Sequence, residues 1–261
     1  MPQPVPSIAW IAIAPIKAMG LVFLDRARFT ADGIAGDRTF ALLDDHDRLV
    51  NGKTLGALAT VRPDWDPAES RLSIRFPDGT EVAGTLEAGP PIPADIFGKN
   101  RAARGVGGPW NAALSTWAGR PLHLAFMDRG EGVDREGTVS LLSTAALRTL
   151  AVAGGASEPL DRRRFRMSLG IDGVAAHAED GWMGRRVRVG AAVLRVGGNV
   201  GRCAVTTQDP DTGRPTFDTL RVLQQTRGHL ATTEPLPFGV WSDVEEGGSV
   251  VVGDPVEVLE P

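Results

Sequence analysis

The chain has 261 residues, of which 42% are hydrophobic and 23% charged, enough for one large domain or two small domains with apolar cores. Its formal net charge of −4 argues against nucleic acid as the main partner, because binding to phosphates needs a strongly basic surface. A single cysteine excludes an intramolecular disulfide, and without paired cysteines the chain alone cannot build an iron–sulfur or cysteine-rich zinc site.

The N-terminal part is predicted to form short strands separated by turns. The first strand is expected over residues 8–14, a continuous apolar run that favours burial. No basic residue precedes this run, unlike a signal peptide, and no apolar run is long enough to span a bilayer, so we expect a cytoplasmic protein without a membrane anchor. Further strands are predicted over 21–30, 39–43, 48–50, 71–76 and 81–86. This spacing favours an antiparallel β-barrel or sandwich.

A linker is predicted over residues 89–109, which are rich in proline, glycine and arginine. It would separate an N-terminal β-rich domain at 8–93 from a second domain at 110–261. An acidic, glycine-rich loop at 128–136 has no apolar anchor, so we expect it to be mobile and near the substrate.

The second domain is predicted to combine strands with a few helices. A helix is expected over 110–118, where apolar residues recur at helical spacing and Gly119 follows. The other predicted elements are a strand over 121–126, a strand over 139–142 running into a capped helix that ends near 154, a hairpin of 185–189 and 192–196, a helix over 217–225 capped by Asp218 or Thr216, and two strands within 247–259. Residues 161–171 are also predicted to be extended, because Phe165 and Met167 alternate with Arg164 and Arg166 to give one apolar and one cationic face.

Cys203, the only thiol, follows a stretch that contains three glycines in six residues. Glycine permits backbone dihedrals closed to other residues and close approach of a ligand. Because residues 204–207 suit a strand, the thiol is expected at the start of a strand, in the mouth of a loop. If the Arg202 guanidinium converges on the thiol, it favours the thiolate, the form that binds metal or attacks an electrophile. Considered alone, however, a single cysteine is more often a small buried hydrophobic residue.

Two motifs resemble those of one protein family. The pattern Arg202-Cys203-x-x-Thr206-Thr207-x-Asp209-Pro210-Asp211-Thr212-Gly213 resembles the signature of the MOSC domain, the C-terminal domain of molybdenum cofactor sulfurases. Residues 15–17 and 33–38 resemble the N-terminal motif of the same family. The resemblance extends from 15 to 258 and is strongest to the amidoxime reducing components and their bacterial relatives. It implies a mainly β protein with a few helices (α+β), in which a β-rich MOSC-N domain precedes a MOSC β-barrel.

The resemblance also implies a set of cofactor-binding residues. Cys203 would ligate the molybdenum of a molybdopterin cofactor, a role that suits a soft thiolate. Lys17, Arg38, Arg166 and Arg202 would face the cofactor phosphate. From the residues alone, a local turn ion pair of Asp37 with Arg38 is the stronger interpretation.

The chain departs from the family pattern at three places. Ala18 stands where the family often has serine, which removes one expected hydrogen bond to phosphate. Met167-Ser168 replaces Pro-Asn after Arg166, and Trp241 replaces a tyrosine near the C-terminus, where substrate access is expected to change.

The function implied is a molybdenum cofactor-dependent oxidoreductase that reduces N-oxygenated substrates, such as N-hydroxylated amidines, hydroxylamines or N-hydroxylated bases. The chain has no nicotinamide or flavin motif, so electrons are expected from a separate ferredoxin-like or similar protein and its reductase. The alternatives are a sulfur carrier with a persulfide on Cys203, a catalytically silent cofactor-binding protein, and a cysteine hydrolase, for which no histidine partner is evident.

Overall fold

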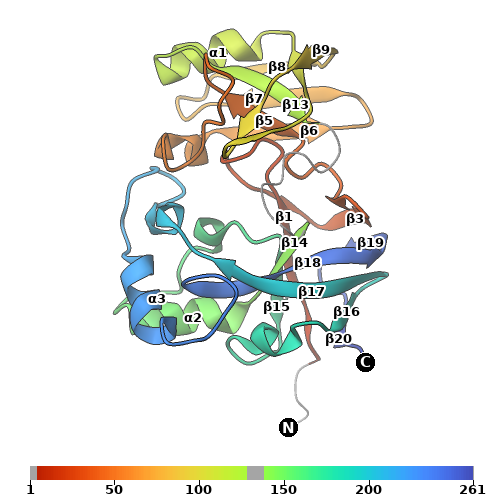
Figure 1. Ribbon diagram of the computed structural model, residues 1–261, viewed down its shortest axis with the longest axis vertical. Coiled ribbons are helices and arrows are strands. Elements are labelled where there is room, and N and C mark those ends of the chain that lie inside the picture. Colours follow the sequence, from red (N-terminus) through yellow and green to blue (C-terminus); the bar gives the residue numbers. More distant parts are fainter. Residues whose placement is uncertain (1–4, 128–137, 261) are drawn as a thin grey trace.

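The computed structural model describes residues 5–127 and 138–260, which form two β-rich lobes stacked along the long axis of the molecule (Figure 1). The expectation of a mainly β protein with a few helices is confirmed. Within the described ranges, no helix is both long enough and apolar enough to cross a membrane.

The larger lobe is built on an eight-stranded sheet in which only β14 and β15 are parallel neighbours. The sheet curls, because Pro6 and Ile8 hydrogen-bond to residues 254–256, at the opposite edge. In spatial order the strands are β2 (Val22–Leu24), β1 (Ser7–Ile13), β15 (Leu169–Asp172), β14 (Val139–Ser143), β18 (Pro237–Glu246), β17 (Ala192–Gly201), β16 (Arg186–Val189) and β20 (Val256–Val258).

Both faces of this sheet are apolar, which explains the unbroken apolar run of the first strand. Ile11 and Leu141 pack inside the curled sheet, whereas Trp10 and Leu142 face the helices α2 (Thr144–Ala153) and α3 (Thr219–Arg227). A small sheet of β3 (Arg26–Thr30), β4 (Gly33–Ile34) and β19 (Gly248–Val251) adjoins the same core.

The smaller lobe, at the top of Figure 1, contains two further sheets and one α-helix. One sheet has the order β5 (Phe40–Leu43), β13 (His123–Met127), β12 (Ala103–Val106), β9 (Ala88–Ile92), and the other has the order β6 (Arg62–Asp66), β7 (Arg71–Arg75), β8 (Glu81–Thr85). The helix α1 (Trp110–Ala118) begins and ends as predicted, stops at the left-handed Gly119, and buries Trp110 and Leu114. A two-stranded hairpin of β10 (Asp95–Ile96) and β11 (Lys99–Asn100) completes the lobe.

The predicted linker at 89–109 is wrong, because four strands occupy this region. Two of the prolines that suggested a linker, Pro90 and Pro91, lie in β9, which is at the edge of its sheet, where proline is tolerated. Pro63 likewise lies in an edge strand, β6, and this strand was not predicted from the sequence. Residues 48–50 form only isolated bridges instead of the predicted strand. The loop predicted at 128–136 lies outside the described residues.

Most elements predicted in the C-terminal half are confirmed. The β16–β17 hairpin, the strand β14 leading into α2, and the terminal strands β19 and β20 lie where the sequence patterns indicated. Asp218 caps α3 as predicted, its carboxylate accepting a hydrogen bond from the Arg221 N–H at 3.2 Å. Ser143 does not cap α2 with its side chain; its hydroxyl accepts instead from the His177 N–H at 3.0 Å.

Candidate active site

A cleft of about 900 Å³ lies where the two lobes meet, and all five predicted site residues line it. The smaller lobe contributes residues 51–53 and the tip of the β10–β11 hairpin. The larger lobe contributes residues 164–168 and 197–206. The predicted residues that the fold brings together are Lys17, Arg38, Arg166, Arg202 and Cys203.

Cys203 is half-buried and lies between β17 and a single turn of 3₁₀-helix, η4 (Ala204–Thr207). The expectation that it begins a strand is therefore wrong. Its carbonyl accepts hydrogen bonds from the N–H of Thr206 at 3.1 Å and the Thr206 hydroxyl at 3.0 Å, so the backbone turns directly after the thiol. These local bonds compete with extension, which strand propensity alone does not foresee.

The signature residues after the cysteine shape the loop that presents it. The Asp209 carboxylate accepts from the N–H groups of Asp211 and Thr212, both at 3.0 Å, which closes a tight turn. The Thr206 carbonyl accepts from the buried Thr219 hydroxyl at 2.9 Å, anchoring the loop to α3. The spacing of the motif is thus explained by hydrogen bonds that fix the position of the thiol.

The cysteine loop is also held against the smaller lobe. Asp211 accepts from Arg62 of β6 at 3.0 Å and from Arg163 at 2.8 Å, so one carboxylate joins both lobes. The Gln208 amide donates to the Gly52 carbonyl at 2.9 Å. Movement of one lobe relative to the other would therefore displace the loop that carries Cys203.

The glycines before the cysteine have a different role from the one predicted. Gly197, Gly198 and Gly201 are part of β17, and none has a positive φ. A side chain at Gly197 or Gly198 would collide with the Trp241 indole, which lies across them on the cleft wall. The close approach that Gly197 and Gly198 permit is therefore that of Trp241, whereas Gly201 faces Glu234 and Pro235.

Arg166 is not in the predicted strand. Residues 162–165 form a 3₁₀-helix, η2 (Arg162–Phe165), because the Asp161 carboxylate accepts from the Arg163 N–H at 2.8 Å, and Arg166 follows with φ 54°. Only residues 169–172 continue as a strand. The apolar and cationic residues alternate in the sequence, but Arg164 and Phe165 lie in a short 3₁₀ turn and not in a strand.

Arg166 as a whole residue is half-buried, and its guanidinium lies among protein atoms at the cleft. Among the described residues, no side chain or carbonyl forms a hydrogen bond or salt bridge with it. Burial and the neighbouring Arg38 guanidinium lower the pKa of Arg166 to about 10, and Asp37 only partly opposes this. A cation in this state is the natural complement of a bound anion.

The other predicted cations are more strongly engaged. Arg38 forms a salt bridge with Asp37, whose carboxylate also accepts from the Ala14 N–H at 2.7 Å, so the local ion pair is confirmed. Arg202 donates to the carbonyls of Phe165 and Phe238, both at 2.9 Å. Its guanidinium therefore ties two walls of the cleft together as well as contributing positive charge.

Left-handed backbone is concentrated at this cleft. Of the eight described non-glycine residues with positive φ, four line it: Ala18, Phe97, Arg166 and Arg38. This conformation is unfavourable for residues with a side chain and gathers at functional sites. Ala18, which removes an expected phosphate contact, has φ 74°.

The lining suits an anionic, phosphate-bearing cofactor with a metal. Among the described residues it holds one carboxylate, Glu234, against seven cationic side chains: Lys17, Arg38, Lys53, Lys99, Arg164, Arg166 and Arg202. The thiol of Cys203 supplies a soft metal ligand in the same cleft. Lys53, Phe97 and Lys99 were not predicted from the sequence. For the two lysines the available signal was that the chain contains only three lysines.

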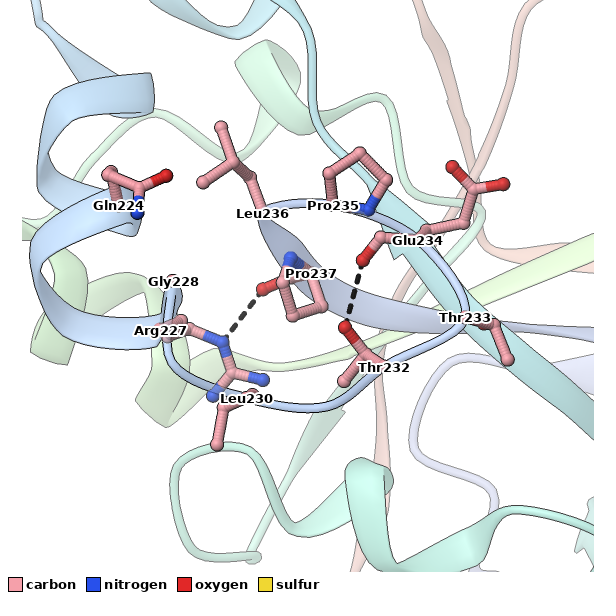
Figure 2. Close-up of a pocket in the computed structure, with 10 residues that line it drawn as sticks. All are labelled: Gln224, Arg227, Gly228, Leu230, Thr232, Thr233, Glu234, Pro235, Leu236 and Pro237. Carbon is pink, nitrogen blue, oxygen red and sulfur yellow. Dashed lines mark hydrogen bonds between the residues drawn. The ribbon is translucent and has the colours of Figure 1, made fainter.

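A second pocket, of about 310 Å³, lies between the end of α3 and residues 228–237 (Figure 2). Thr233 and Glu234 line both cavities, so this segment separates the pocket from the cleft. Its one arginine, Arg227, donates to the Pro237 carbonyl at 2.7 Å and to Asp180 at 2.5 Å. Because that charge is already satisfied, the cleft with Cys203 is the better candidate site.

Comparison with known proteins gives two family matches that together span most of the chain. Residues 120–257 match the MOSC domain, and residues 5–113 match the MOSC N-terminal beta barrel domain. The division between the two matches falls near the end of α1.

Three curated relatives illustrate the similarity. Mitochondrial amidoxime-reducing component 1 of Xenopus laevis is 25% identical over 97% of this chain and 82% of its own length. Mitochondrial amidoxime reducing component 2 of Homo sapiens is 35% identical over 35% of this chain and 29% of its own length. Molybdenum cofactor sulfurase of Anopheles gambiae is 25% identical over 98% of this chain, which spans only 37% of that relative.

Proposed function

Because the chain belongs to the family of MOSC-domain proteins, we propose that it is a molybdenum cofactor-dependent oxidoreductase that reduces N-hydroxylated compounds. The support is similarity over nearly the whole chain to an amidoxime-reducing component, together with a cationic cleft that contains the only thiol. The single observation that carries the proposal is the Arg166 guanidinium, enclosed and without a hydrogen-bond partner among the described residues, in the same cleft as Cys203.

In the proposed reaction the substrate N–O bond breaks, two electrons and two protons are taken up, and the reduced nitrogen compound and water are released. The bound cofactor supplies the electron-transfer chemistry, whereas the protein binds and orients the reactants. Cys203 would hold the metal. Lys17, Arg38, Arg166 and Arg202 would neutralise the phosphate, with Arg166 contributing most because its charge is least satisfied.

Electrons would come from a separate redox protein, of the ferredoxin type or similar, and its reductase. The sequence contains no cluster ligands and no flavin or nicotinamide motif, so we expect no turnover with NADH or NADPH alone. The cytoplasmic location remains a prediction from the sequence.

The direct test is reduction of benzamidoxime by purified protein with reduced methyl viologen as an artificial one-electron donor. Wild-type protein is expected to form benzamidine, and Cys203→Ala is expected to fold normally but lose at least about 100-fold in rate, as when a metal ligand is removed. Wild-type protein that carries molybdenum and pterin but reduces no N-hydroxylated compound would refute the proposal.

A sulfur carrier with a persulfide on Cys203 is the second candidate, favoured by the similarity to a molybdenum cofactor sulfurase across 98% of this chain. The two roles differ in how the thiol reacts, because a carrier sulfur must remain open to exchange. Cyanide releases persulfide sulfur as thiocyanate. Stoichiometric thiocyanate release that Cys203→Ala abolishes would favour the carrier, whereas slow alkylation of cofactor-loaded protein would favour the metal ligand.

A further inference from the structure

The tip of the β10–β11 hairpin projects an aromatic ring into the cleft. Phe97 and Gly98 form its two-residue turn, with φ 55° and 81°, a conformation that suits asparagine and glycine far better than phenylalanine. The Phe97 side chain is 50% exposed. A left-handed backbone at a residue with a large side chain and the exposure of an apolar ring both cost free energy. An aromatic face at this position is therefore available to a planar ligand.

Positive charge surrounds this ring. All three lysines of the chain line the cleft, and the Lys17 ammonium lies 5.4 Å from the centre of the Phe97 ring. Lys53 and Lys99 are exposed at the rim. Neither of these two ammonium groups has a hydrogen-bond or ion-pair partner among the described residues. They can therefore bind an anion without breaking an existing salt bridge.

The lysines lie close to the thiol loop, as well as to the aromatic ring. Gly52, which precedes Lys53, packs against the Val205 side chain, two residues after Cys203. The Gly52 carbonyl also accepts from Gln208 of the same loop. Lys53 is thus exposed beside the loop that presents the thiol, whereas Arg166 is half-buried. The two sets of cations can serve different anions.

We propose that the cleft selects N-hydroxylated substrates that carry a planar aromatic ring and an anionic group, a phosphate or carboxylate. The ring would stack on Phe97, and the anionic group would bind Lys53 and Lys99. This inference rests on the proposed function, because it names the substrate class of the same site.

The test compares N4-hydroxycytidine with its 5′-monophosphate, a pair that differs only in the anionic group. With methyl viologen as donor, KM for the monophosphate is expected to be about 10-fold lower, since two rim contacts to a charge contribute modestly each. The advantage should shrink as salt rises. The double variant Lys53→Gln/Lys99→Gln is expected to abolish this advantage, so that KM for the monophosphate equals KM for the nucleoside. Arg148→Gln, an exposed site on α2, is the matched control and should leave both KM values unchanged.

The ring is tested with Phe97→Asn, which keeps a residue suited to the left-handed turn. KM for both substrates is expected to rise, because stacking does not depend on the phosphate. Equal KM values for nucleoside and monophosphate in the wild type would overturn the inference while leaving the proposed function intact. Loss of molybdenum from Lys53→Gln/Lys99→Gln would assign the lysines to the cofactor and also overturn it.

Binding of the products separates this inference from the proposed function. Calorimetry on cofactor-loaded protein is expected to show tighter binding of cytidine 5′-monophosphate than of cytidine, with the preference lost in Lys53→Gln/Lys99→Gln. That preference in a protein without reductase activity would sustain the binding site and refute the reductase. No preference between the two products would refute the binding site.

Discussion

Arg166 is the residue on which the anion site depends most. Its charge is enclosed and unpaired among the described residues, and a pKa lowered to about 10 means that the fold disfavours the charged form. At neutral pH the cofactor-free protein therefore bears a cost, which a bound anion would remove. Between pH 10 and the ordinary arginine pKa, the unfolded chain binds more protons than the folded one, so the stability of the folded protein rises and this cost shrinks progressively across that interval.

Arg166→Gln is therefore expected to stabilise the cofactor-free protein at pH 7 by about 1–3 kcal/mol, because it deletes a disfavoured charge. The same variant should retain less cofactor. Thermal unfolding of cofactor-free wild type and variant checks the first result, with Arg148→Gln as the exposed control. A destabilised Arg166→Gln with normal cofactor content would indicate that Arg166 has a purely structural role.

The candidate site could be named from the sequence at the level of residue identity, but its conformations could not. Lys17, Arg38 and Cys203 stand in motifs that resemble the family, and the fold brings them to one cleft. The left-handed turn at Arg166 was missed, since an apolar–cationic alternation favours a strand, whereas residues 162–165 form a 3₁₀-helix that ends at Arg166. The Asp161 cap that starts this turn is visible in the sequence, and it was the overlooked signal.

Among the elements, β17 and β18 determine the shape of the cleft wall beneath the cysteine loop. Trp241 of β18 lies across Gly197 and Gly198 of β17, where the register of the two strands shifts. The indole thus occupies space that a side chain on β17 would otherwise fill.

Gly197→Ala is expected to destabilise the protein by about 1–3 kcal/mol, because the new methyl group overlaps the Trp241 ring. Gly105→Ala on β12 is the matched control, since its methyl group would make ordinary contacts. Denaturant unfolding of both variants, each with and without Trp241→Ala, measures the coupling free energy between the substituted position and Trp241. If Trp241→Ala fails to relieve the effect of Gly197→Ala, the proposed clash is not its cause.

Elements with strong local signals were predicted well, and elements with conflicting signals were not. Helix α1 has an apolar face at helical spacing and ends at Gly119, and helix α3 is capped by Asp218. These are local features that packing does not override. By contrast, β9 contains Pro90 and Pro91, which indicate a loop unless the strand is known to be at a sheet edge. Edge position depends on long-range pairing, which the sequence pattern does not contain.

At the scale of the whole molecule, strand pairing crosses the boundary between the two family matches. β1, near the N-terminus, pairs with β15 of the larger lobe, and β13 pairs with β5 of the smaller lobe. Each lobe therefore contains strands from both halves of the sequence. The cleft between them depends on this exchange, as well as on the Asp211 bridge to Arg62 and Arg163.

Separate fragments 1–109 and 110–261 are consequently expected to remain unfolded, because each loses strands from the interior of a sheet. The intact chain is expected to unfold in a single cooperative transition. Circular dichroism and denaturant titration of the two fragments and the full chain test this. Cooperative unfolding of residues 110–261 alone would show that β1 is dispensable and that the domains predicted from the sequence are autonomous.

The cleft with Arg166 and Cys203 is proposed to hold a phosphate-bearing molybdenum cofactor. The most direct measurement is the molybdenum and pterin content of wild-type, Arg166→Glu and Arg148→Glu proteins, freshly purified from a cofactor-producing host supplied with molybdate. We predict nearly equal amounts of molybdenum and pterin in the wild type and in Arg148→Glu, and at least about 10-fold less of both in Arg166→Glu, because reversal places a carboxylate against the phosphate. Wild-type protein without molybdenum, or an equal molybdenum content in Arg166→Glu, would show that this cleft does not bind the cofactor through Arg166.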